Sequence, residues 1–122
     1  MDFEELYKEI MNLDPNVRLA IVLNRSGERV SGGYRENLKH FLTPDELNMV
    51  LYHASQRWEG RKHLAHKIGK AIYSMTEYEK VKRMSFPIDE DHMVLISVEP
   101  FVDHTKIIKG VLNLIKMVNQ QV

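Results

Sequence analysis

Apolar residues recur at two different spacings along this chain, and the change from one spacing to the other predicts the order of its elements. Residues 2–13 are predicted to form a helix, because their apolar residues have the spacing of one helix face. These residues are Phe3, Leu6, Tyr7, Ile10 and Met11. Asp2 and two glutamates begin this segment, where the helix dipole favours negative charge. Asp14-Pro15 ends it, because the residue before a proline is disfavoured in the helical region.

Two β-prone runs predict buried strands. Residues 19–23 are continuously apolar, as in a central strand covered on both faces. Turn residues follow at 24–28, with Gly27 suited to positive φ, and a return strand ends or bulges at Gly32-Gly33. Residues 93–98 form the second run. Between the two, 71–78 and 80–88 are mixed strand-like segments, and the boundary near Glu79 has no strong turn residue.

A capped central helix is predicted from Thr43-Pro44-Asp45-Glu46, which combines an N-cap residue, a proline at the first helical position and a capping-box glutamate. Its expected buried stripe consists of Leu47, Val50, Leu51, Ala54 and Trp58. Gly60 either caps this helix or interrupts it. The sequence leaves open whether residues 61–69 continue the helix or form a loop.

The last predicted helix, capped by Asp103 or Thr105, has an unusually wide apolar surface. That surface consists of Ile107, Ile108, Val111, Leu112, Leu114, Ile115 and Val118. Two explanations remain open, and they are compatible. The helix is buried between the sheet and the first helix of the same chain, or it contacts a second copy.

These segments predict an α+β fold in the order α-β-β-α-β-β-β-α. We expect a single domain over residues 1–122, with a five-stranded antiparallel sheet flanked by helices. A chain of 122 residues suits one domain and buries enough surface to fold without disulfide or metal support.

Composition narrows the classes of function. The net charge is zero, with 17 basic and 17 acidic residues, which argues against a dedicated nucleic-acid binder. Cysteine is absent, so disulfides, thiol catalysis and thiolate metal sites are excluded, and a reducing compartment is favoured. No run reaches the roughly 18 apolar residues of a membrane span. We therefore expect a cytoplasmic protein with no membrane association.

Catalytic and metal motifs are weak. His63 and His66 are spaced to share a helix face, but two imidazoles alone make an incomplete metal site. We expect His53 to be partly buried and hydrogen-bonded rather than catalytic. The glycines do not form a phosphate-binding loop, and no serine sits in a nucleophile elbow. The sequence therefore predicts a protein that is not an enzyme and has no cofactor or bound metal.

Basic residues concentrate in 57–70, where five lysines and arginines accompany one glutamate, and continue at 80–83. They form either a solvated face or a patch for an anion or an acidic partner. Aromatic and arginine side chains are the usual energetic anchors of protein interfaces. The residues expected to bind a partner are Tyr52, Arg57, Trp58, Arg61, Lys62 and Lys67.

Over nearly its whole length the chain resembles the roadblock / dynein light chain group of the profilin-like class. The resemblance rests on the hairpin VRLAIVLNRSGERVSGG, the long central helix, and MVLISVEP running into a C-terminal helix. It implies a dimeric scaffold or regulator that works with small Ras-like GTPases or anchors larger assemblies. In that group two protomers join sheets or pack central helices into a flat platform. This chain departs from the pattern in its basic 61–83 segment and its long 34–43 connection.

The leading hypothesis is a non-enzymatic, homodimeric interaction module. Two alternatives stay open. One is a PAS-like sensor, which would need a closed apolar cavity between sheet and helices. The other is an anion or nucleic-acid binder that uses the basic region 57–83, whose binding would weaken with added salt.

Overall fold

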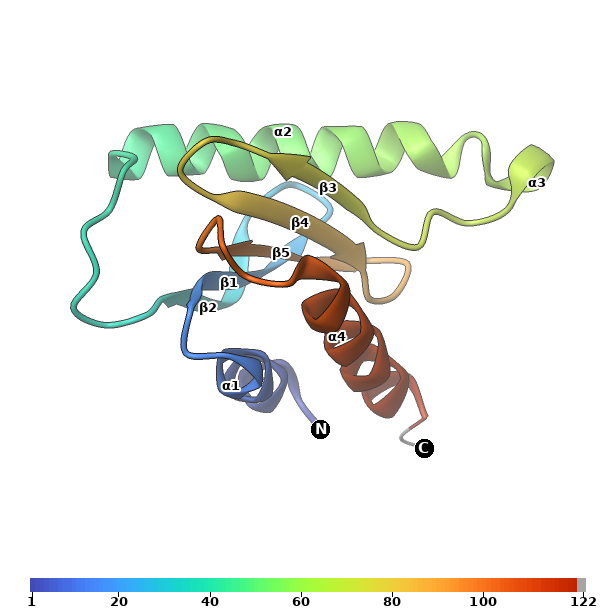
Figure 1. Ribbon diagram of the computed structural model, residues 1–122. Coiled ribbons are helices and arrows are strands. Elements are labelled where there is room, and N and C mark those ends of the chain that lie inside the picture. Colours follow the sequence, from blue (N-terminus) through green and yellow to red (C-terminus); the bar gives the residue numbers. More distant parts are fainter. Residues whose placement is uncertain (121–122) are drawn as a thin grey trace.

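A five-stranded antiparallel sheet lies between helices on its two faces (Figure 1). The computed structural model describes residues 1–120. The elements in chain order are α1 (Phe3–Leu13), β1 (Val17–Asn24), β2 (Arg29–Tyr34), α2 (Pro44–Lys62), α3 (Ala65–Ile68), β3 (Ser74–Glu77), β4 (Lys82–Pro87), β5 (His92–Val98) and α4 (His104–Asn119). The predicted α+β class and element order are confirmed, with the short α3 as an addition.

The strand order is β2-β1-β5-β4-β3, and each neighbouring pair is antiparallel. The two apolar runs, β1 and β5, are next to each other near the middle of the sheet, where Ile21 pairs with Leu95. Both strands are buried along almost their whole length, as a strand covered on both faces requires. The edges of the sheet are β2 and β3.

The sheet separates two hydrophobic cores. On one face α1 and α4 pack on alternate residues of the strands, including Val22 and Val94. On the other face α2 packs Leu51 and Trp58 against residues such as Ile21. Most of the wide apolar surface of α4 is used in the first core, since Ile107, Ile108, Val111, Leu114 and Ile115 are buried there. Burial within one chain therefore accounts for most of that surface.

The helix starts follow the predicted capping chemistry. The Asp2 carboxylate accepts from the Glu5 backbone N–H at 2.8 Å at the start of α1. Thr43 and Glu46 form the complete capping box of α2. At α4 the cap is Asp103, which accepts from the N–H of Thr105.

Several boundaries differ from the expected ones. Gly60 lies inside α2, which ends at Lys62, and the separate helix α3 follows after a short break. The strand β2 continues through Gly32 and Gly33 to Tyr34. The strands β3 and β4 are shorter than predicted, because residues 78–81 form the turn between them.

Candidate interaction surface

The side of α2 that faces away from the sheet exposes large apolar groups. Met49 is 55% exposed and Tyr52 is 50% exposed, whereas Leu47 and Leu51 in the same helix are buried against the strands. The two exposed residues are three positions apart, so their side chains are neighbours on the helix surface. We call Met49, Tyr52, His53, Gln56 and Arg57 the outer face of α2; all of them are exposed.

The strand β3 is an open edge of the sheet. It pairs with β4 on one side, and within residues 1–120 no strand pairs with its other side. The exposed rings of Tyr73 and Tyr78 flank the strand. An edge strand offers unpaired N–H and C=O groups, which another strand can complete. The end of β3 lies near α2, because Glu77 of β3 lines the same groove as Leu47 and Val50 of α2, and Figure 1 draws the two elements next to each other.

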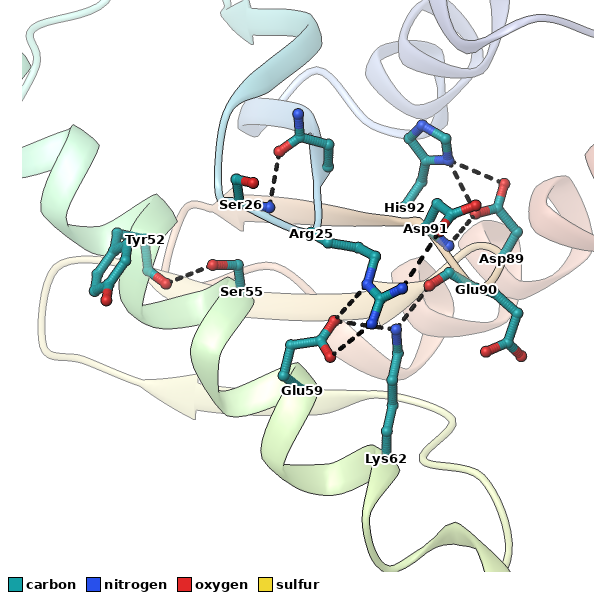
Figure 2. A network of polar contacts seen from close by, with 11 residues as sticks. Arg25, Ser26, Tyr52, Ser55, Glu59, Lys62, Asp89, Glu90, Asp91 and His92 are labelled. Atoms are coloured by element: carbon teal, nitrogen blue, oxygen red, sulfur yellow. Dashed lines mark hydrogen bonds and ion pairs between the residues drawn. The ribbon is translucent and has the colours of Figure 1, made fainter.

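A polar network holds the second half of α2 in place (Figure 2). Arg25, from the β1–β2 turn, donates to the Glu59 carboxylate through Nε at 3.1 Å and through Nη2 at 3.3 Å. Lys62 Nζ donates to Glu59 Oε1 at 3.1 Å and to the Glu90 carbonyl at 2.7 Å. One helix is thereby connected to two turns of the sheet.

The electrostatics of this network centre on Glu59. The hydrogen bond from Arg25 lowers the pKa of the Glu59 carboxyl, and the hydrogen bond from Lys62 lowers it further. The same hydrogen bond to Glu59, together with its charge, raises the pKa of the Arg25 guanidinium. Both effects favour the ionised pair. These groups are accessible to solvent, so their role is to position α2 rather than to supply much stability.

The structure corrects the expected role of Trp58. Its side chain is 4% exposed and belongs to the core between α2 and the sheet, with Lys62 Nζ 3.9 Å from the ring centroid. The membership of Trp58 in the buried stripe is thus confirmed, but its ring is not presented to a partner. Lys62 already contacts the Trp58 ring and donates hydrogen bonds to Glu59 and to the Glu90 carbonyl within the same chain. The physical reason is that a tryptophan at the core spacing of the helix gains more by burial than by exposure.

The other predicted contact residues are more accessible. Tyr52, Arg57 and Lys67 are exposed, on α2 and α3, and Arg61 is half-buried near the end of α2. His53 is also exposed, next to the ring of Tyr52, which corrects the expectation of a partly buried histidine.

Sequence reasoning missed several exposed apolar groups on this side: Met49, Leu64, Ile68, Ile72, Tyr73 and Tyr78. A signal was present for Met49, since with Tyr52 it makes an i, i+3 pair outside the core stripe. For Tyr73 and Ile72 there was none, because their exposure depends on β3 beginning only at Ser74.

A groove of about 780 Å³ lies between α2, the 34–43 connection and the β3–β4 turn. Its walls include Leu47, Tyr78 and Arg83. It is open to solvent, so it does not match the closed cavity expected for a sensor. Arg18 lines it but is already paired with Glu99 at 2.8 Å.

Residues 1–120 were compared with the requirements of a metal site and of a membrane-spanning helix. His63 closes α2 while His66 belongs to α3, and among residues 1–120 no cluster of three or more potential ligands is formed. Within the same residues, no helix combines the length and the hydropathy needed to cross a bilayer.

Comparison with known proteins gives a family and a fold. Residues 1–119 match a family of unknown function (DUF6659). A search of curated proteins finds no significant match.

Similar solved structures are roadblock domains with low sequence identity. A Roadblock/LC7 domain from Streptomyces avermitilis has 17% identity and a TM-score of 0.73, over 98% of this chain and 96% of that one. MglB in a tetrameric arrangement has 12% identity and a TM-score of 0.76, over 93% and 82%. MglC from Myxococcus xanthus has 11% identity and a TM-score of 0.67, over the whole of both chains. The fold is therefore a roadblock fold, as the resemblance implied.

Proposed function

Because the chain belongs to the family of unknown function DUF6659 and has a roadblock fold, we propose that it is a non-enzymatic interaction module that works as a homodimer. The proposed compartment is the cytoplasm, which suits a chain without cysteine. Support comes from the arrangement of α2 and β3. The polar networks around α2 serve to hold that helix to the sheet.

One observation carries the proposal: α2 exposes apolar side chains on its outer face, and β3, which lines a common groove with α2, is an open edge of the sheet. A twofold axis beside β3 would pair it with the same strand of a second copy. Such pairing completes the open edge in both chains and brings the two α2 helices close together. The same patch is then used twice, as a twofold interface requires.

Charge along α2 favours an antiparallel arrangement of the two helices. The first turn is acidic, with Asp45 and Glu46, and the last turn is basic, with Arg61 and Lys62. Antiparallel neighbours place each acidic end beside a basic end. Complementary charges of this kind steer association and fix the register of the two chains.

The mass of the protein in solution tests the dimer. Sedimentation or light scattering at micromolar concentration is expected to give the mass of two chains. Met49→Asp is expected to shift that mass toward one chain, because a carboxylate would be placed in an apolar contact. Met117→Asp is the matched control, since Met117 is similarly exposed but lies on α4, in the layer on the opposite face of the sheet. A mass of one chain at every concentration would reject the proposal.

The further partner we propose is a protein, and a small Ras-like GTPase is the candidate that the roadblock resemblance implies. Tyr52 and Arg57, which are exposed on α2, are its proposed contacts in the assembled dimer. The test is titration of the dimer with purified small GTPases in their GDP and GTP-analogue forms. Binding that depends on the nucleotide and is weakened by Arg57→Glu supports this partner. The proposal is contradicted if the unmodified protein and the Arg57→Glu variant bind the GTPase equally well, or if neither binds it.

A further inference from the structure

Residues 61–73, here called the basic lobe, protrude from the body of the protein. They include the end of α2, the helix α3 and the segment that leads back to β3. In Figure 1 the label α3 marks the part that extends beyond the end of the sheet. The outward course of the chain is set by a break after Lys62 and by Gly69, which has φ of +88°.

The charged residues of the lobe are all basic. It carries Arg61, Lys62, Lys67 and Lys70 as well as two histidines, and residues 60–76 contain no aspartate or glutamate. Lys62 and Lys70 make ion pairs with Glu59 and Glu90, the second at 3.6 Å between well-exposed side chains. Arg61 and Lys67 have no ion pair among the residues that the structure describes.

The same lobe exposes aliphatic side chains. Ile68 is 81% exposed, Ile72 is 63% exposed and Leu64 is 55% exposed. Leu64 and Ile68 stand at the two ends of α3, four positions apart, which places them on one side of that turn. Exposed aliphatic groups at the tip of a protrusion carry a cost in water, which contact with an apolar medium removes.

Glu59 and Glu90 balance part of this charge at the base of the lobe, and another part is balanced at a distance. The helix α1 is acidic, with Glu4, Glu5 and Glu9, and Asp2 caps its start. It lies at the opposite end of the molecule from α3 in Figure 1. The protein therefore has no net charge but a marked separation of charge, which would turn the basic lobe toward a negative surface.

We propose that the basic lobe binds the surface of membranes that contain anionic phospholipids. Leu64, Ile68 and Ile72 enter the boundary between headgroups and acyl chains, while Lys67 and Lys70 contact the phosphates. In this mode of binding the lobe lies at the membrane surface, and no membrane-spanning helix is needed. The sequence led us to expect no membrane association, because no run of residues is long and apolar enough to span a bilayer. Binding at the surface does not require such a run. It requires only one chain and does not depend on the proposed dimer.

The exposed groups favour lipid over nucleic acid or protein. Single-stranded nucleic acids are held by stacking on several aromatic rings. The lobe has one such ring, Tyr73, which lies at its base beside Phe86 of β4, whereas the exposed groups around α3 are aliphatic. A stable protein interface uses roughly 800 Å² of each partner and a complementary surface. A lobe that extends beyond the sheet and exposes aliphatic groups beside lysines therefore suits contact with a membrane surface better than contact with either of these partners.

Vesicle sedimentation with the full-length protein tests the proposal. We expect binding to phosphatidylcholine vesicles that contain about 30% phosphatidylserine, and little binding to phosphatidylcholine alone. Raising the salt from about 0.05 M to about 0.5 M is expected to weaken the binding. Leu64→Ser/Ile68→Ser and Lys67→Glu/Lys70→Glu are each expected to lower the partition coefficient about tenfold. All four positions are exposed, so the fold is retained.

Matched controls lie elsewhere on the surface. Phe101→Ser removes another exposed apolar group, and Lys106→Glu/Lys109→Glu reverses two exposed charges on α4. Neither is expected to change binding. Because the chain has no cysteine, His66→Cys carrying an environment-sensitive dye should shift to the blue with anionic vesicles, and Asn113→Cys should not.

Three results would overturn the proposal. They are no binding to anionic vesicles at low salt, equal loss of binding in the control variants, and loss in the charge variant without loss in the aliphatic variant. Binding to a single-stranded RNA oligonucleotide in place of vesicles would assign the lobe to nucleic acid instead. The Met49→Asp variant is expected to bind vesicles through a single lobe, so failure of the dimer and failure of the membrane contact can be told apart.

Discussion

Gly27 in the β1–β2 turn lies so close to α2 that a Cβ atom at this position would be 2.9 Å from the Cα of Tyr52. The same glycine has φ of +81°, a conformation that other residues adopt at a cost. The close contact, together with the ion pair of neighbouring Arg25, places the hairpin turn directly against the helix. The position of the outer face of α2 thus depends on a glycine at the tip of the hairpin.

Gly27→Ala is expected to lower the free energy of unfolding by about 2 kcal/mol or more, from backbone strain and the clash with Tyr52. Urea denaturation measures this change. Gly60→Ala is the matched control, because Gly60 lies in α2 with no atom within 4 Å of an added Cβ. That change is expected to add about 0.5–1 kcal/mol through helix propensity. Equal effects of the two substitutions would contradict the close contact.

Trp58→Ala is expected to destabilise the protein by about 3–5 kcal/mol, because it leaves a cavity between α2 and the sheet. Tyr52→Ala on the exposed side of the same helix is expected to stay within about 0.5 kcal/mol. Both are measured by thermal or urea unfolding under conditions where the protein is monomeric. A large effect at Tyr52 with a small one at Trp58 would mean that the helix has the opposite face inward.

The ion pairs of Glu59 predict a pH dependence of stability. The pKa of Glu59 is lowered in the folded state. Its contribution to the stability of the fold is therefore fully present above the ordinary pKa of a glutamate, about 4.3, and is lost as the pH falls through the folded-state pKa. Glu59→Gln is expected to cost about 0.5 kcal/mol at pH 7, a small value because the pair is accessible to solvent. Denaturation at a series of pH values should show this difference shrinking as the pH falls below the ordinary pKa of a glutamate, about 4.3. Glu79→Gln, at an exposed residue with no ion pair among those described, should show no such trend.

Arg18 holds the 34–43 connection against the sheet. Its Nη1 donates to Glu99 Oε1 at 2.8 Å, its Nη2 donates to the Lys39 carbonyl at 2.7 Å, and Phe41 covers the guanidinium. Arg18→Met is expected to cost about 1–3 kcal/mol, since Glu99 loses its partner. Cleavage by trypsin after Lys39 should become faster as the connection loosens. Arg29→Met, at an exposed arginine of β2, is the control, and an equal effect there would argue against this role.

Prediction from the sequence was most accurate where the signal is local. The capping box at Thr43 and Glu46 satisfies backbone groups within one turn, so its residues alone specify the start of α2. The apolar runs of β1 and β5 identified buried strands for a similar reason. The surface was harder to predict. Trp58 had the spacing of a core residue and the chemistry of an interface anchor, and only its burial in the same core as Met93 and Leu95 decides between the two.

By itself, the sequence determined the kinds of elements and their order, because periodicity, proline, glycine and caps act over a few residues. Tertiary structure decided which strand is left at the edge, which side of α2 is covered, and that the apolar surface of α4 is largely buried against the sheet. It also brought Arg25, Glu59 and the carbonyl of Glu90 together from three separate segments. Such contacts form between residues that are far apart in the chain. Their free energy depends on how the segments pack together, so the sequence of one segment does not predict them.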